Sequence, residues 1–249
     1  MRFKDHFSGH AADYGRFRPR YPTELIEFLT HAAPGRSLAL DLATGNGQAA
    51  LDLADRFDRV LASDASAPQL AAAHRHPRVT YLRHGAECLP VRAGCADLVI
   101  AAQAAHWFDL SRVHPEIRRV LKPRGLVAFF TYETLRVEAS FDARLDAFYT
   151  DVIGPYWPPE RRHVENGYAT LDFPYESIET PTFELVTQWD LPRVIDYLGT
   201  WSAVVRFRAA RNHDPVGDFA AEARRSWPDG EVRRIRWPIH LRAGRVAPI

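Results

Sequence analysis

The stretch LALDLATGNGQ, residues 38–48, decides the fold of this 249-residue chain. A run of apolar residues is interrupted by Asp41, and Gly45 and Gly47 follow shortly before an alanine-rich segment. This order predicts a buried strand, a glycine turn and a helix. Because glycine has no Cβ, the backbone of this turn can approach a bound ligand closely.

The alternation of short apolar runs with helical spacing continues beyond this turn to residue 132. Strands are predicted at residues 37–42, 59–64, 79–83, 97–102 and 126–132, and helices at 48–57, 67–76 and 112–121. Five strands that alternate with helices are typical of a parallel sheet covered on both faces. Such a sheet binds its ligand beyond the carboxyl ends of the strands.

Two regions flank this predicted core. Residues 1–35 hold an aromatic and arginine-rich arm followed by a predicted helix, with Thr23 as a plausible N-cap. Residues 136–249 hold further helices, a strand near 183–189 and a last strand near 232–241. Prolines 155, 158, 159 and 174 mark a loop-rich stretch within this region. We interpret this second region as a lid or substrate cap.

The overall prediction is a single α/β domain over residues 1–249. Its sheet is Rossmann-like, doubly wound and mostly parallel, with about seven strands. Residues 36–135 form the cofactor-binding core, between the N-terminal arm and the helical C-terminal substrate cap.

Two acids close to the glycine turn point to a nucleoside ligand. Asp64 ends the next predicted strand, where an acid can accept hydrogen bonds from both hydroxyls of a ribose. Residues 45–50 also match the G-x-G-x-x-[GA] dinucleotide pattern, but Asp41 would repel a pyrophosphate. An ammonium group would instead be attracted by Asp41. S-adenosylmethionine has that layout, with adenosine at one end, an amino acid at the other and a sulfonium between.

At these residues the chain resembles the class I S-adenosylmethionine-dependent methyltransferases, and within them the small-molecule group that is similar to trans-aconitate methyltransferase. The resemblance spans nearly the whole chain. It rests on the order and spacing of six segments: HFSGHAADYGRFRPRYP (6–22), DLATGNGQAA (41–50), ASDAS (62–66), GAECLPV (85–91), DLVIAAQAAHWFD (97–109) and RVLKPRGLVAFF (119–130).

Two residues depart from the family's pattern. Ala43 stands where many members have the first glycine, and its small side chain should still allow close approach. Arg124 stands where RVLKPGG is usual, and Gly125 is then expected to make the turn.

The resemblance implies a set of cofactor contacts. Asp41 and the turn at 43–47 would hold the methionine moiety, Asp64 the ribose, and Ala65, Ala86 and Glu87 the adenine. Gln103 would reach the methionyl end, and an arm segment would fold over the cofactor. The implied cofactor-binding residues are Asp41, Ala43, Thr44, Gly45, Gly47, Asp64, Ala65, Ala86, Glu87, Gln103, Phe7, Tyr14 and Arg18.

For the acceptor, His106 and Trp107 would lie near the methyl-transfer point. His106 is the candidate catalytic residue, which positions the substrate and serves as a base only if the acceptor needs one. Trp201 and Arg206 lie on one predicted helix, and their spacing lets them share part of one helix face. Arg206 could then clamp a carboxylate. The alternative, which the sequence slightly favours, is an amphipathic lid helix with Trp201 in the core and Arg206 solvated. Transfer would be an in-line displacement onto a small molecule, with a carboxylate or hydroxyl as the expected acceptor group.

Two other functions stay open from the sequence. One is an NAD(P)-dependent oxidoreductase, although neither of the chain's two lysines, Lys4 and Lys122, completes a Tyr-x-x-x-Lys pair. The other is a cofactor-binding protein without catalysis.

The composition of the chain argues against two classes of binding partner, nucleic acids and membranes. The net charge of +1 gives no electrostatic reason to expect a nucleic-acid partner, and no apolar stretch is long enough to expect a membrane partner. The two cysteines fit no metal pattern, so we expect no metal and a cytoplasmic location. The oligomeric state is open.

Overall fold

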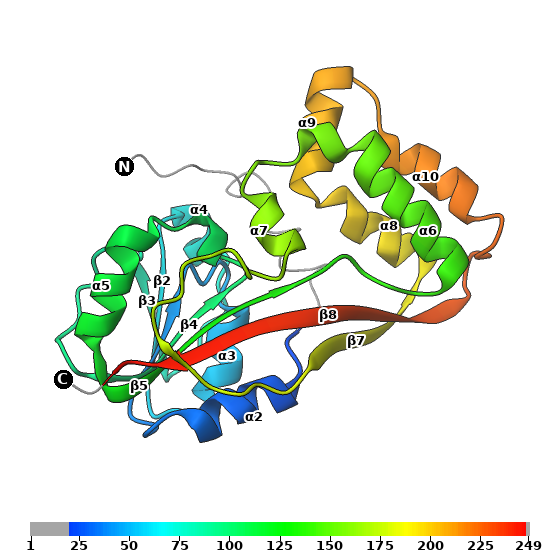
Figure 1. The fold of residues 1–249 in the computed structure, drawn as a ribbon. Coiled ribbons are helices and arrows are strands. Elements are labelled where there is room, and N and C mark those ends of the chain that lie inside the picture. The colour runs from blue at the N-terminus through cyan, green and yellow to red at the C-terminus, as the bar shows by residue number, and fades with distance from the viewer. Residues whose placement is uncertain (1–19, 248–249) are drawn as a thin grey trace.

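Eight strands form one sheet in the computed structural model, which describes residues 20–247. The sheet order is β3-β2-β1-β4-β5-β8-β6, and β7 also pairs with β8 (Figure 1). The strands are β1 (Ala39–Leu42), β2 (Val60–Asp64), β3 (Val79–Arg83), β4 (Ala96–Ala102), β5 (Leu121–Tyr132), β6 (Glu176–Ser177), β7 (Phe183–Asp190) and β8 (Val232–Arg245). The predicted Rossmann-like sheet is confirmed, and the strand missing from the prediction is the exposed two-residue β6.

Strands β1 to β5 are parallel, and the chain reverses its direction of progress across the sheet at β1. Asp41 in β1 is paired with Ala62 of β2 on one side and with Ile100 of β4 on the other. The connection after β1 leads to β2 on one side, and the connection after β3 returns to β4 on the other side of β1. This change of side opens a crevice beyond the carboxyl ends of β1 and β4. Asp41 therefore lies close to the point where a doubly wound sheet binds its ligand.

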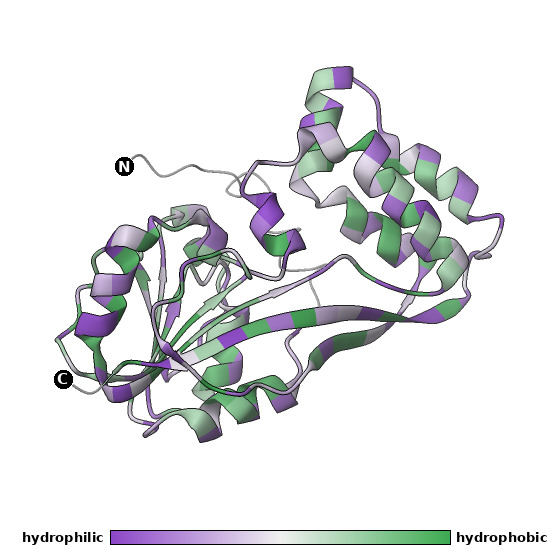
Figure 2. Ribbon diagram, viewed as in Figure 1, coloured by the Kyte–Doolittle hydropathy of each residue, from purple (hydrophilic) through white to green (hydrophobic). Residues whose placement is uncertain are grey.

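Helices cover both faces of the sheet and build a separate group at one end (Figure 1). One apolar cluster joins the sheet to α2 and α3, and another joins it to α5. Green and purple alternate along these helices in Figure 2, as expected for helices with one buried face. The α-helices are α2 (Thr23–Ala32), α3 (Gln48–Ala54), α4 (Ala67–Ala71), α5 (Leu110–Val120), α6 (Ala139–Ala147), α7 (Arg161–Glu165), α8 (Leu191–Gly199), α9 (Ser202–Arg211) and α10 (Pro215–Ala223).

The helical group at the end of the sheet, which we call the cap, comes from two insertions. The first carries α6 and α7 and lies between β5 and β6. It also contains a π-helical turn (Phe148–Val152), in which Ile153 N–H donates to the carbonyl of Phe148. The second insertion carries α8, α9 and α10 and lies between the paired strands β7 and β8. The cap is thus held by a long antiparallel hairpin.

Three predicted helices differ from the structure. Pro22, rather than Thr23, is the N-cap of α2, and no side chain caps that end. Helix α4 ends at Ala71, and the Tyr81 hydroxyl donates to the carbonyl of His74 in the non-helical segment that follows.

The single helix predicted around Trp201 is in fact two helices. The Thr200 hydroxyl donates to the carbonyl of Tyr197, and the extended backbone of Trp201 starts α9 as its N-cap. Trp201 and Arg206 therefore do not share one face of one helix, which corrects the sequence prediction.

Arg124, not Gly125, makes the turn that leads into the apolar part of β5. Arg124 has a φ of 61°, which is in the left-handed region, whereas Gly125 does not have a positive φ. Gly125 is needed for space, because a Cβ there would lie 2.8 Å from a Leu121 methyl carbon and 2.9 Å from the Lys122 carbonyl oxygen. The expectation that Gly125 would replace the glycine missing at 124 was wrong.

This turn gives a stability prediction. We expect Arg124→Gly to raise the free energy of unfolding by about 1 kcal/mol, because glycine removes the left-handed strain at an exposed side chain. Gly125→Ala should lower it by about 1–3 kcal/mol through overpacking. Urea denaturation of both variants is the measurement, and equal effects of the two would contradict this assignment.

Candidate functional site

The glycine turn after β1 is built from left-handed backbone. Gly45 and Gly47 have φ values of 60° and 88°, and Ala43 has a φ of 53°. The Thr44 N–H donates to the carbonyl of Ser63, which ties the turn to β2. Ala43 therefore has a strained backbone as well as a small side chain. It holds a conformation that glycine adopts more easily, and such strain is common at binding sites.

Asp41 is fully buried at this turn. Its Oδ2 accepts a 2.5 Å hydrogen bond from the Thr44 hydroxyl, while no described residue donates to its Oδ1. The pKa of Asp41 is raised to about 7, mainly by burial and in smaller part by the nearby charge of Asp64. A buried carboxylate oxygen without a donor is costly, so the site favours a cationic or hydrogen-bond-donating ligand.

Asp64 closes the other side of the turn. Its Oδ2 accepts from Gly45 N–H at 2.8 Å and its Oδ1 accepts from Ser66 N–H at 2.7 Å. Each carboxylate oxygen can accept more than one hydrogen bond, so the fixed carboxylate can still accept from ligand hydroxyls. The Ser63 hydroxyl and the Gln69 Oε1 are also buried without a described partner near the turn. The structure thus brings Asp41 and Asp64 together, as the sequence predicts.

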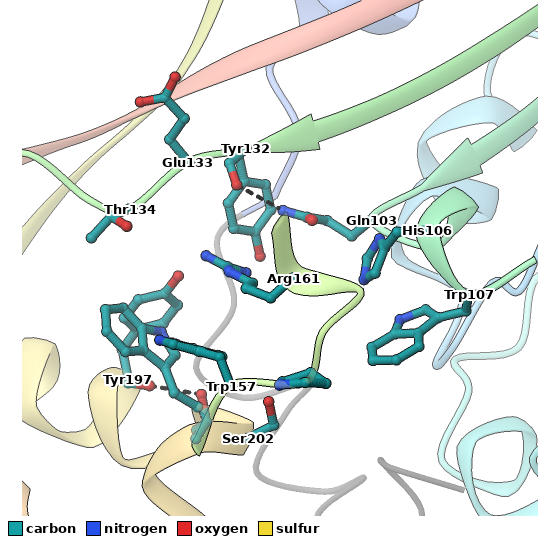
Figure 3. Close-up of a pocket in the computed structure, with 13 residues that line it drawn as sticks. Gln103, His106, Trp107, Tyr132, Glu133, Thr134, Trp157, Arg161, Tyr197 and Ser202 are labelled. Carbon is teal, nitrogen blue, oxygen red and sulfur yellow. Dashed lines mark hydrogen bonds between the residues drawn. The ribbon is translucent and has the colours of Figure 1, made fainter. Parts of the chain in front are cut away.

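A cavity lies between the carboxyl edge of the sheet and the cap (Figure 3). Its walls come from the segment after β4, the end of β5, the start of α7 and the junction of α8 and α9. The described lining residues are Gln103, His106, Trp107, Tyr132, Glu133, Thr134, Trp157, Pro158, Arg161, Tyr197, Thr200, Trp201 and Ser202.

Gln103 and His106 join the end of β4 to this cavity. Gln103 has a φ of 57°, and its side-chain amide is held by β5 through the Thr131 hydroxyl at 2.6 Å and the Tyr132 carbonyl at 3.3 Å. His106 Nδ1 lies 2.8 Å from the Tyr168 hydroxyl. The pKa of His106 is lowered to about 3, mainly by burial and in smaller part by the positive charge of Arg161. His106 is therefore a neutral side chain at neutral pH.

The remaining sequence-predicted residues have different positions. Ala86 is buried in the apolar cluster under α5, and the Glu87 carboxylate lies against Gly85. Ala65 follows β2, and its carbonyl accepts a 3.5 Å hydrogen bond from Arg83. Arm residues Phe7, Tyr14 and Arg18 lie outside the described residues.

Arg206 is not among the residues that line this cavity. The cavity is lined by Trp107 and Trp201 but not by Arg206, whose guanidinium donates at 3.5 Å to the carbonyl of Tyr156. The arginine in the cavity is Arg161, from the first residue of α7. No motif marks it, because an Arg-Arg pair after two prolines is typical of an exposed loop. Its contact with Tyr149, twelve residues earlier, is visible only in the fold.

Comparison with known proteins identifies the family. A sequence profile described as a methyltransferase domain matches residues 40–129. The structure of a candidate type II methyltransferase from Anaeromyxobacter dehalogenans is 44% identical to this chain, covers 94% of it and 100% of its own length, and has a TM-score of 0.88. The chain belongs to the class I S-adenosylmethionine-dependent methyltransferases. The NAD(P)-dependent alternative is thereby set aside.

Two further proteins are similar to this chain, one in sequence and one in fold. A candidate methyltransferase of Dictyostelium discoideum is 28% identical over 248 residues, which are 96% of this chain and 94% of that protein. The Haemonchus contortus phosphoethanolamine N-methyltransferase 2, solved with S-adenosylhomocysteine, shares the fold at 18% identity and a TM-score of 0.50. That structure covers 100% of this chain, which spans 61% of it. No helix within residues 20–247 is long and apolar enough to span a membrane.

The residues at the turn fit the family's cofactor, S-adenosylmethionine. The unpartnered Oδ1 of Asp41 suits the ammonium of its amino-acid end, and the fixed carboxylate of Asp64 suits two ribose hydroxyls. Gly45 and Gly47 have positive φ values and no Cβ, so a ligand can lie directly against the backbone of the turn. When bound, the cofactor supplies an electrophilic methyl group on a sulfonium.

The buried Asp41 gives a pH prediction for the cofactor-free methyltransferase. Its pKa is raised from 3.8 to about 7 on folding, so the folded state holds a proton that the unfolded state releases above pH 4. The free energy of unfolding should therefore fall by roughly 4 kcal/mol at most as the pH rises from 4 to 7. We expect Asp41→Asn to remove much of this fall.

Thermal unfolding at pH 5 and pH 8 measures this effect, with Asp58→Asn, at an exposed carboxylate, as the matched control. If Asp41→Asn and wild type lost the same stability between the two pH values, the buried carboxylate would not be the cause.

Proposed function

We propose that this methyltransferase transfers a methyl group to a small-molecule acceptor through a carboxylate or hydroxyl oxygen, by in-line displacement. The observation that carries the proposal is the adjacency of two sites at one edge of the sheet: the donor side at Asp41 and the cavity that begins at Gln103. Asp41 lies in β1 and Gln103 directly follows the neighbouring parallel strand β4, so both are at the carboxyl edge of the sheet. Gln103 also lines the cavity (Figure 3). A methyl group between them would lie close to an acceptor in the cavity.

The size and lining of the cavity support a small acceptor. Its volume is about 60 Å³, and aromatic rings form much of its wall. Trp157 and Trp201 have ring centroids 5.6 Å apart, and Tyr197 lies 6.0 Å from Trp201. Aromatic faces exclude water and attract a cation such as a sulfonium. A trans-aconitate-like group of acceptors is consistent with this lining, and the free thiols of Cys88 and Cys95 are consistent with a reducing cytoplasm.

The low pKa of His106 favours the carboxylate among these two acceptor groups, because a carboxylate needs no base. A side chain with a pKa of about 3 takes up a proton poorly near neutral pH. We infer that neutral His106 orients the acceptor by a hydrogen bond through Nε2, while Nδ1 is engaged with the Tyr168 hydroxyl. The positioning role expected from the sequence is kept, and the conditional role as general base is not favoured.

The central experiment is cofactor binding and methyl transfer by the purified protein. Calorimetry with S-adenosylhomocysteine should show binding that Asp64→Asn weakens by about 10–100-fold, because charge-assisted hydrogen bonds to the ribose are lost. Asp218→Asn, at an exposed carboxylate in the cap, is the control. Radiolabelled S-adenosylmethionine with panels of small acids and alcohols then tests transfer.

Each result of this experiment has one interpretation. Binding with transfer to an acid or alcohol supports the proposal. Binding without transfer to any member of either panel favours the non-catalytic alternative, and unchanged binding by Asp64→Asn contradicts the role of that carboxylate.

The role of His106 gives a separate pH prediction. Because its pKa of about 3 lies below the working range, the turnover rate should not follow a histidine ionisation between pH 5 and 8. His106→Gln, which keeps a hydrogen-bond donor, should lose about tenfold in turnover without a change in the pH profile. A rate that rises through pH 6–7 in the wild type and loses this dependence in His106→Gln would show that His106 is a base.

A further inference from the structure

The cavity contains a cationic side chain whose terminal nitrogens have no hydrogen-bond partner among residues 20–247. Arg161 is the only arginine or lysine among the described residues that line it. Its Nε donates a 2.8 Å hydrogen bond to the Tyr149 hydroxyl, whereas neither Nη atom donates to any described residue. In Figure 3 the guanidinium lies in the middle of the cavity, between Tyr132 and Trp157. The two Nη groups that can form a bidentate pair with a planar anion are therefore available.

Several contacts hold this guanidinium in place. Arg161 Cζ lies 4.7 Å from the centroid of the Trp157 ring and 5.7 Å from that of Tyr149. Burial raises the pKa of Tyr149, so its hydroxyl keeps its proton and donates it to Glu165 Oε1 at 2.6 Å. The same hydroxyl accepts from Arg161. Tyr149 belongs to the π-helical turn, a feature often found at functional sites.

The charge of Arg161 is not balanced within the cavity wall. The nearby His106 is neutral. Glu133, the one carboxylate in the described lining, pairs with His240, and its side chain points away from Arg161 in Figure 3. A second donor is also unsatisfied, because the Trp157 Nε1–H is buried without a described acceptor. The cavity thus offers donors and positive charge, and an acceptor with an anionic oxygen group would satisfy both.

We propose that the two terminal nitrogens of Arg161 bind a carboxylate of the methyl acceptor, and that Tyr149 and Glu165 are the positioning residues of this arginine. This inference rests on the proposed function and narrows it to acidic acceptors. One guanidinium matches the single charge and planar shape of a carboxylate. A cationic acceptor is disfavoured, because it would meet Arg161 and the sulfonium at once.

The test measures anion binding to protein saturated with S-adenosylhomocysteine, so it does not depend on turnover. The probes are straight-chain dicarboxylates of two to six carbons, their uncharged diamides and inorganic phosphate, added in calorimetric titrations at constant ionic strength. We expect at least one dicarboxylate to bind and its diamide to bind at least 30-fold more weakly. Arg161→Gln should abolish that difference, and Arg161→Lys should restore part of it.

Two further variants separate positioning from binding. Tyr149→Phe removes only the hydroxyl that fixes Nε, so we expect a loss of three- to tenfold in dicarboxylate affinity with unchanged affinity for S-adenosylhomocysteine. Arg162→Gln, at the exposed neighbour of Arg161 in α7, is the matched control and should bind as wild type. The thermal midpoint with S-adenosylhomocysteine shows whether each variant is folded.

Three results would overturn the inference: no dicarboxylate binds, Arg161→Gln binds dicarboxylates as well as wild type, or phosphate binds more tightly than every dicarboxylate in an Arg161-dependent way. The last result would assign the site to a phosphorylated acceptor. The proposed function has its own readout in the same titrations. If S-adenosylhomocysteine fails to bind wild type, the proposed function fails. If S-adenosylhomocysteine binds but the protein binds dicarboxylates no more tightly than their diamides, only the role of Arg161 fails.

Discussion

The burial of one carboxylate constrains this site more than any other interaction. Asp41 is part of a strand that is paired on both sides, so its side chain is fully enclosed at the place where the sheet opens toward its ligand. One of its oxygens is satisfied by Thr44 and the other by no described residue. The free protein bears the cost of this unsatisfied oxygen, and a bound ammonium offsets it. Stability and cofactor binding are therefore coupled at a single side chain.

The second half of the site depends on how the cap is attached. The cavity needs Gln103 from the sheet, Arg161 from the first insertion and Trp201 from the second. These residues are brought together because β5 and β8 pair with each other over Leu126–Tyr132, and β8 continues beyond that pairing to hold β7. The donor side is thus formed by local sequence around one turn, and the acceptor side by contacts between distant segments.

This difference explains what could be predicted from the sequence. Strand endings and glycine positions follow local rules, so Asp41 and Asp64 were predicted at one edge of the sheet, and the structure has them there. Arg161 follows no periodicity, and its importance comes from Tyr149 and Trp157, which meet it only after the first insertion folds. Arg206 was chosen from helical spacing, but Thr200 divides that helix in two. Backbone strain at Arg124 was likewise invisible, since only a dihedral angle reveals it.

The hairpin of β7 and β8 has a mechanical consequence. Eight consecutive residue pairs, from Phe183 with Ile239 to Asp190 with Val232, connect the helices of the second insertion to the sheet as a twisted ribbon. A lid on two loose linkers can swing about a hinge, but a lid on a paired ribbon can move only by bending it. The helices of the second insertion are therefore expected to keep their orientation relative to the sheet whether or not the cavity holds a ligand.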